Sequence, residues 1–231
     1  MKYTTSDGFI ISSIFDSKSI ASGFGTKYIS PQFTDSMGNS LIAMDQVHGD
    51  TVKIVDQHSH ERIPGVDAVV SKLPGLFLTV RTADCVPILF ADSFNKVIAV
   101  AHAGWRGSLM NISGKVIETM IEHGAQLKKI TVSIGPAINA CCYEIFGERK
   151  NQFESTFPGW DAIFELHDNK TALNLVKLNY LQLIKLGLSD NNIDYHSFCT
   201  SCDADRFYSY NRDKTAIKTM ISFISLYGKQ Q

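Results

Sequence analysis

The sequence predicts an α+β fold in which mixed β-sheets pack against each other with helices on the outside, in α-β-β-α layers. Five strand-like segments follow closely on one another between 51 and 104. Two of them, 86–90 and 97–101, contain continuous apolar runs, which is typical of strands covered on both faces. Helical and strand-like segments mix without a regular βαβ rhythm, and neither G-x-G-x-x-G nor G-x-x-x-x-G-K-S/T occurs. A Rossmann or P-loop fold is therefore not favoured.

Length and composition predict one domain that acts on small molecules. The chain has 231 residues, 44% hydrophobic and 19% charged, so it can bury a large core, and we expect a single catalytic domain over 1–231. The net charge of −1 argues against a nucleic-acid or membrane partner. No stretch approaches the roughly 18 apolar residues of a membrane helix, and the N-terminus makes a poor signal peptide. Five cysteines, an odd number, favour reduced thiols and a cytoplasmic protein.

The first half of the chain is predicted to consist mainly of strands. The apolar run after Gly8 is expected to form the first of them. Turn signals at Pro64-Gly65, at Pro74-Gly75 and at 93–95 separate the next ones. Those strands are expected at 51–56, 67–71, 76–80, 86–92 and 96–104.

The second half of the chain is predicted to mix helices with further strands. A helix is expected at about 108–123, with Ser108 as its N-cap and Gly124 as its stop. A strand follows at 128–136, and the C-terminal strands are expected at 193–198, at 206–211 and in a last segment to about Leu226. Two further helices are expected near 142–155 and 172–187.

Three short polar segments at the ends of apolar strands could carry chemistry. They are Gln46–Asp50, Arg81–Cys85 and His102–Gly107, and folds present active sites where a sheet meets a loop. Taken alone, His102 could be a buried histidine bonded to a carbonyl, and Cys85 a small core residue. The spacing of His48, Cys85 and His102 matches no local zinc ribbon or finger, so spacing alone leaves these alternatives open.

The motifs QVHGD, RTADC, AHAGWRG, IGPAINACCYEI, CTSC and FYSYNRD occur in this order and resemble the laccase-domain family. Its members have been described as multicopper polyphenol oxidases and as purine nucleoside phosphorylases. The resemblance covers about 41–213, and it implies that His48, Cys85 and His102 are the metal ligands. One departure is the segment Lys214–Lys218, where the family usually has a Thr-Gly-Arg step.

The resemblance implies a zinc-dependent purine nucleoside phosphorylase that acts on adenosine, inosine and methylthioadenosine, with adenosine deaminase activity. Nucleoside and phosphate are then the expected small-molecule partners, and copper is the alternative metal. Two imidazoles and one thiolate leave the fourth tetrahedral position of a zinc ion open. Zinc in such a site lowers the pKa of bound water to roughly 7, which suits deamination at C6 of adenine.

Other residues of the same segments are candidates for substrate contacts. Arg81 and Arg106 each lie near a predicted ligand in the sequence and could bind phosphate, or they could form structural ion pairs. Gln46 is a candidate substrate contact. Asp84 could move a proton, orient a ligand or cap a turn.

Three alternative functions use the same residues differently. A copper polyphenol oxidase needs several H-x-H pairs, whereas the chain has seven histidines and one such pair, His58 and His60. A cysteine hydrolase would use Cys85 as nucleophile and a neighbouring histidine as base, and some relatives are linked to peptidoglycan-precursor editing. A metal-dependent binding module would bind zinc without turnover.

The other four cysteines are expected to play a smaller part. Cys141 and Cys142 are predicted to open a helix and at most to line the pocket. Cys199 and Cys202 form a single C-x-x-C pair, so a four-cysteine zinc site is possible only if it also uses Cys141 and Cys142.

Overall fold

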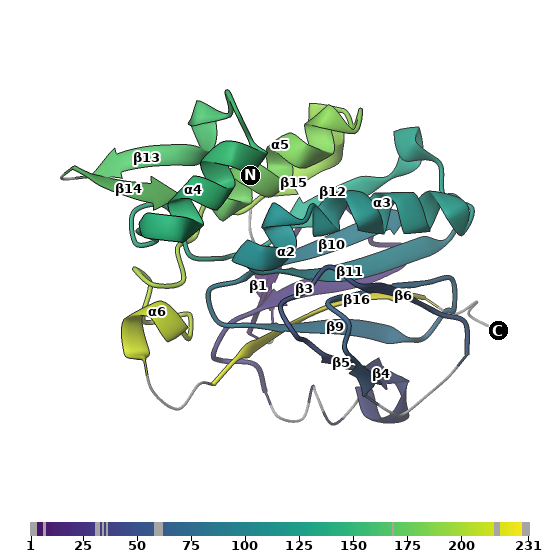
Figure 1. The fold of residues 1–231 in the computed structure, drawn as a ribbon. Helices are drawn as coiled ribbons and strands as arrows, with labels where there is room; N and C mark the ends of the chain where they lie inside the picture. Colours follow the sequence, from purple (N-terminus) through teal and green to yellow (C-terminus); the bar gives the residue numbers. More distant parts are fainter. Residues whose placement is uncertain are drawn as a thin grey trace.

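The computed structural model describes residues 4–227, except 7, 31, 32, 34, 36, 58–61, 168 and 215–217. Two six-stranded sheets form its centre (Figure 1). The strand order of the first sheet is β1-β2-β3-β16-β9-β4. Its strands are β1 (Thr4–Ser6), β2 (Phe9–Ile11), β3 (Ile20–Gly25), β16 (Met220–Leu226), β9 (Phe77–Thr82) and β4 (Leu41–Ile42).

The second sheet has the order β15-β12-β10-β11-β8-β6. Its strands are β15 (Ile193–Tyr195), β12 (Thr131–Ile134), β10 (Val86–Asp92), β11 (Val97–Ala103), β8 (Ala68–Ser71) and β6 (Val52–Val55). β10 pairs antiparallel with β11 and β12, whereas β6–β8 and β12–β15 are parallel. Every residue of β10 and β11 is buried, which explains the continuous apolar pattern of these two strands.

Alternate residues of β10 face two different cores. Leu89 and Ala91 pack between the sheets, with Leu78 and Ile224 of the first sheet. Ile88 and Phe90 face the other way, into a core that helices complete. The predicted α+β arrangement of packed mixed sheets is therefore confirmed, with the central strands of the second sheet covered on both faces.

Helices cover the second sheet, and a smaller hairpin lies at one end of the molecule. The α-helices are α2 (Trp105–Leu109), α3 (Ile112–Glu122), α4 (Gly147–Thr156), α5 (Leu175–Lys185) and α6 (Tyr210–Asp213). Short 3₁₀ turns are η1 (Gly38–Ser40), η2 (Leu127–Lys129), η3 (Asp161–Ile163) and η4 (Asp190–Asn192).

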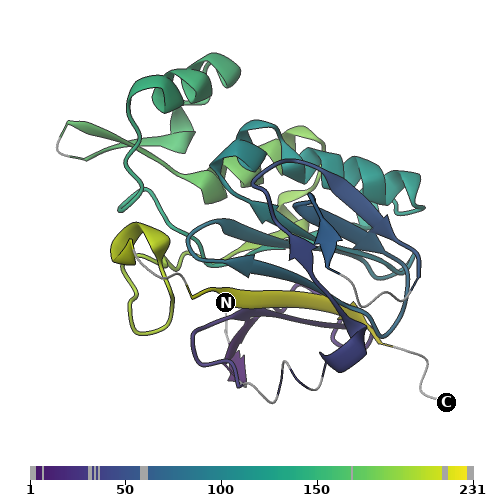
Figure 2. The same cartoon turned by 60° about the horizontal axis from the view of Figure 1, so that its bottom comes forward.

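Two small sheets complete the fold. Strands β13 (Phe164–His167) and β14 (Lys170–Leu173) form a hairpin beside α4 (Figure 2), and β5 (Met44–Asp45) pairs with β7 (Ile63–Pro64). No helix in the described part of the chain is long and apolar enough to cross a membrane.

The helix predicted at 108–123 is interrupted. Asn111 adopts a left-handed conformation with φ 60° and caps α3 by accepting a hydrogen bond from the Gly114 N–H. Ser108, the predicted N-cap, is instead buried inside α2. The prediction was wrong at this boundary because an asparagine tolerates the left-handed region and can restart a helix.

Three other boundaries also differ from the prediction. The segment 206–211 is not a strand, because the Ser209 side chain accepts a hydrogen bond from the Arg212 N–H and starts α6 there. The helix expected from 142 begins only at Gly147, so Cys141 and Cys142 lie in a turn. The helix expected from 172 begins at Leu175, since the preceding residues pair in β14.

Candidate active site

Strand pairing brings the three polar segments to one edge of the second sheet. β10 and β11 are antiparallel with Pro87 opposite His102, so Cys85, just before β10, lies beside the end of β11. β8 pairs with the other side of β11, with Ala68 opposite Ala101. The segment before β6 reaches the same edge, because the backbone N–H groups of 47–49 bond to the residue that precedes β8.

His48, Cys85 and His102 converge, with one ligand atom from each within 4.8 Å of the others. His102 is buried, Cys85 is partly buried and His48 is exposed. Gly104 lies against them, and a Cβ at this position would be 3.2 Å from Cys85 Sγ and 3.3 Å from His48 Cδ2. The absence of a side chain at Gly104 therefore leaves room for two of the three groups.

Asp67 holds this arrangement from behind, and the sequence pattern did not indicate it. Its buried carboxylate lies 2.7 Å from Nδ1 of His102. The same carboxylate accepts hydrogen bonds from the N–H groups of Val47, His48 and Gly49 at 3.2, 3.0 and 2.7 Å. A carboxylate on Nδ1 leaves Nε2 of His102 free to bind a metal. The available signal was a charged residue at the start of the strand predicted at 67–71, next to the apolar run of residues 68–70.

Hydrogen bonds shift the protonation of the buried groups. Burial works to lower the pKa of His102, but hydrogen bonds with Asp67 and Cys85 raise it to about 9. Burial works to raise the pKa of Cys85, but hydrogen bonds with His102 and His48 lower it to about 7. For Asp67 the burial effect is outweighed by hydrogen bonds with His102 and Gly49, so its pKa is below its ordinary value. The site therefore favours a thiolate beside imidazole groups.

A cleft of about 790 Å³ opens over these residues. All seven residues that the sequence indicated line it, namely Gln46, His48, Arg81, Asp84, Cys85, His102 and Arg106. The cleft walls also contain residues that the sequence pattern did not indicate, among them Arg62, Arg149 and Tyr210. Trp105, Tyr143 and Lys214 line the cleft as well.

The cleft carries more positive than negative side chains. Its cations are Arg62, Arg81, Arg106, Arg149 and Lys214, and its carboxylates are Asp45 and Asp84. Burial and the neighbouring charge of Arg62 lower the pKa of Arg81. This concentration of guanidinium groups favours an anionic ligand.

Trp105 brings two of the arginines together. The guanidinium carbons of Arg106 and Arg149 lie 4.4 and 4.5 Å from the centre of its ring. Arg149 also donates a hydrogen bond to the hydroxyl of Tyr143 at 3.4 Å. Burial raises the pKa of Tyr143 to about 12, so its phenol stays neutral near pH 7. Cation–π contacts thus help to hold at the cleft two charged groups that pair with no carboxylate among the described residues.

The side chain of Gln46 forms two hydrogen bonds with the backbone of Arg81. Its amide nitrogen donates to the Arg81 carbonyl at 2.7 Å, and its amide oxygen accepts from the Arg81 N–H at 2.9 Å. Both polar groups of the amide thus join the loop of His48 to the strand that carries Arg81. The arrangement positions Arg81.

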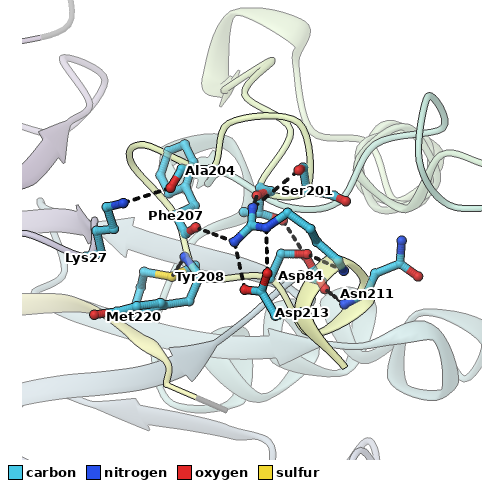
Figure 3. A network of polar contacts seen from close by, with 12 residues as sticks. Lys27, Asp84, Ser201, Ala204, Phe207, Tyr208, Asn211, Asp213 and Met220 are labelled. Atoms are coloured by element: carbon cyan, nitrogen blue, oxygen red, sulfur yellow. Dashed lines mark hydrogen bonds and ion pairs between the residues drawn. The ribbon is translucent and has the colours of Figure 1, made fainter. Parts of the chain in front are cut away.

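Asp84 is buried and adopts a left-handed backbone conformation with φ 89°. Its two carboxylate oxygens accept hydrogen bonds from Thr200 Oγ1 and from the Asn211 N–H, each at 2.6 Å. Figure 3 shows Asp84 beside Asn211 in this network. Asp84 therefore joins the turn next to Cys85 to a C-terminal segment more than a hundred residues away.

A second group of possible metal ligands, made of cysteines alone, lies outside the cleft lining. Among the described residues, two groups could hold a metal ion, the first being His48, Cys85 and His102. The second consists of Cys141, Cys142, Cys199 and Cys202.

The chain is similar to a known protein family, to characterised enzymes and to solved structures. Residues 31–227 match the model of a family described as multi-copper polyphenol oxidoreductase laccase. The chain is 37% identical over 178 residues to the purine nucleoside phosphorylase ORF3 of Streptomyces griseus, covering 76% of this chain and 70% of that protein. It is 31% identical over 207 residues to the adenosine deaminase RL5 from an unknown prokaryotic organism, covering 83% and 76%. The crystal structure of YlmD from Geobacillus stearothermophilus superposes with a TM-score of 0.87 at 25% identity, covering 98% of this chain and 99% of that one.

Proposed function

The chain belongs to the family described as multi-copper polyphenol oxidoreductase laccase, and we propose that it is a zinc-dependent purine nucleoside phosphorylase with adenosine deaminase activity. A purine nucleoside phosphorylase and an adenosine deaminase are each more than 30% identical to it over most of its length, so it is an enzyme of this kind. The observation that carries the proposal is the meeting of a His₂Cys group and several arginines in one cleft.

The donor set fits zinc. Two imidazoles and a thiolate are ligands that zinc prefers, and three protein ligands are typical of a catalytic site with an open position. The Asp67 contact to Nδ1 of His102 is the usual support of a zinc-binding histidine. Bound zinc would act as a Lewis acid that makes a water molecule acidic near pH 7.

The arginines suit the phosphate of phosphorolysis. In this reaction a phosphate oxygen bonds to C1′ of the ribose, the glycosidic bond breaks, and the purine leaves with its bonding electrons and takes up a proton. Arg106 and Arg149, both stacked on Trp105, can bind phosphate oxygens through paired N–H groups. Arg81 also lines the cleft and can add to its positive charge, and Gln46 holds its backbone.

Asp84 is proposed to act by positioning. Both of its oxygens already accept hydrogen bonds at 2.6 Å, so the carboxylate orients the turn that carries Cys85. The cleft aromatics Tyr143 and Tyr210 offer flat surfaces for a purine base.

A cysteine hydrolase is the second candidate, because Cys85 lies next to two imidazoles, as a thiol nucleophile would require. The two proposals differ in their metal requirement. A copper polyphenol oxidase has less support, since only one of the two metal-compatible groups among the described residues contains histidine, whereas multicopper sites need several.

The proposal is tested with a chromatographic product assay on adenosine and inosine, with and without phosphate, on zinc-loaded protein. Phosphate-dependent release of free base together with phosphate-independent formation of inosine from adenosine supports both activities. Turnover of neither nucleoside by protein that has zinc bound at His48, Cys85 and His102 would reject the function and retain the metal site.

A further inference from the structure

Four cysteines from two distant segments meet outside the cleft. Cys141 and Cys142 lie in the turn before α4, and Cys199 and Cys202 lie in the turn after β15. A parallel bridge between Ala137 and Cys199 brings the two segments together. The remaining cysteine, Cys85, belongs to the other group, so all four cysteines outside the cleft lie in this one cluster.

The sulfur atoms are spaced as a metal ion would require. Cys202 Sγ lies 3.2 Å from Cys142 Sγ and 3.5 Å from Cys141 Sγ, and all four sulfurs lie within 4.8 Å of one another. Four sulfurs around a tetrahedral zinc ion, with bonds of about 2.3 Å, are roughly 3.8 Å apart along each edge. The two shortest separations lie slightly below this value, and the 4.8 Å upper limit on the others includes it.

A pair of disulfides explains the arrangement less well. All the cysteines are free, and the sulfur separations of 3.2 and 3.5 Å are well beyond the ~2.05 Å of an S–S bond. Cys202 is also nearly equidistant from Cys141 and Cys142, so the geometry selects no single partner. A shared central ion satisfies all four thiols at once.

The surroundings suit thiolate ligands. The Asn139 N–H donates a hydrogen bond to Cys199 Sγ at 3.4 Å, as backbone amides do around metal-bound sulfur. The Arg212 guanidinium, which is paired with Asp213, donates hydrogen bonds to the carbonyls of Thr200 and Ser201 at 3.0 and 3.3 Å and so holds the turn between Cys199 and Cys202 in place. Cys141 and Cys202 are exposed, so an ion can enter from solvent.

We propose that Cys141, Cys142, Cys199 and Cys202 bind a second zinc ion, distinct from the ion at His48, Cys85 and His102. Four thiolates complete a tetrahedral shell and leave no position for substrate, so this site is structural. Binding converts four thiols to thiolates and releases their protons to solvent.

The second ion would hold one wall of the cleft. Thr200, between two of the proposed ligands, donates to the Asp84 carboxylate beside Cys85. The Asn211 amide donates to the Cys142 carbonyl at 3.1 Å, and Asn211 lines the cleft. The ion thus fixes together the turn of Cys141, the turn of Cys199 and the segment that closes on Asp84.

The test is elemental analysis of purified protein, with X-ray absorption spectroscopy at the zinc edge as a second measurement. Wild type is expected to hold two zinc ions per chain. His48→Ala, after mild chelation, is expected to keep one, whose neighbours are sulfur only at ~2.3 Å. Cys199→Ser with Cys202→Ser is expected to keep the other ion, with a lower Tm. Ser201→Ala, in the same turn, keeps all four thiols and should retain both ions.

A native-state labelling experiment covers the case in which the double cysteine variant does not fold. In wild type the four thiols should resist alkylation until a strong chelator is added. Rapid alkylation of wild type without chelator, disulfides found by mass spectrometry, or a single zinc ion that disappears in His48→Ala would each overturn the proposal. Iron in place of zinc would overturn the assignment of the metal.

Discussion

Nδ1 of His102 lies 2.7 Å from Oδ1 of Asp67, and both side chains are buried. The carboxylate also bonds to three successive backbone N–H groups around His48. One buried residue therefore orients two of the three proposed ligands. Its effect on zinc affinity can be measured separately from catalysis.

Asp67→Asn is expected to weaken zinc affinity about 10- to 100-fold, the usual effect of removing the partner of a metal-binding histidine. The amide has one acceptor oxygen and an N–H₂ group that would face N–H donors. Zinc affinity is measured by competition with a chelator. Asp92→Asn is the matched control, because Asp92 is equally buried but bonds to Phe94, Asn95 and Gln126. Equal losses of affinity in the two variants would show a general effect of instability.

Gly104→Ala is expected to reduce zinc content while the protein stays folded. The added Cβ would lie 3.2 Å from Cys85 Sγ and 3.3 Å from His48 Cδ2, so these groups must move. The backbone at Gly104 has φ −70° and ψ 175°, which alanine adopts without strain. Zinc per chain and far-ultraviolet circular dichroism are the measurements. Full zinc occupancy would mean that the His48 loop adapts freely.

Arg106→Ala is expected to raise the KM for phosphate about 10- to 100-fold, since a hydrogen bond to a charged group contributes roughly 1.5–3 kcal/mol. Zinc content should not change. Arg106→Lys should recover only part of the affinity, because lysine offers a point charge without paired N–H groups. Arg206→Ala, a guanidinium that pairs with Asp203 outside the cleft lining, is the control. A normal phosphate KM in Arg106→Ala would move the assignment to Arg81 or Arg149.

Thr200→Val tests whether Asp84 acts by positioning. The change keeps the shape of the side chain and removes the 2.6 Å hydrogen bond to the Asp84 carboxylate, leaving a buried acceptor with one partner fewer. We expect a loss of about 1–3 kcal/mol in the free energy of unfolding and a lower kcat, resembling Asp84→Asn. If Asp84→Asn is inactive and Thr200→Val has a normal kcat, Asp84 takes part in the reaction directly.

Chelation is expected to separate the two proposed reactions. Deamination should stop when zinc at His48, Cys85 and His102 is removed, because the attacking water depends on the metal. Phosphorolysis should fall less, since phosphate is already a nucleophile and is held by arginines. Inosine from adenosine and free base from inosine are followed in parallel during the titration. Deamination at full rate in metal-free protein would favour the cysteine hydrolase.

The sequence predicted local features where a single physical cause dominates. β10 was predicted with its observed bounds, Val86–Asp92, because burial on both faces produces a continuous apolar run. Predictions were wrong where a side chain bonds to the backbone: Asn111 interrupts the predicted helix and Ser209 starts α6 in a predicted strand. Such side-chain bonds compete with regular structure and leave little trace in hydrophobic periodicity. The extent of the catalytic domain and its cytoplasmic location stay predictions.

The sequence by itself determined the family, the packed-sheet fold class and the three residues proposed as zinc ligands, because short motifs and apolar runs are local properties of the chain. Only the tertiary structure decided that Asp67 supports His102, that Arg149 joins Arg106 on Trp105, and that Cys141 and Cys142 meet Cys199 and Cys202. These relationships join residues that are far apart in the sequence. They depend on strand register and on turns at the sheet edge, which bring side chains together without imposing any spacing on the sequence.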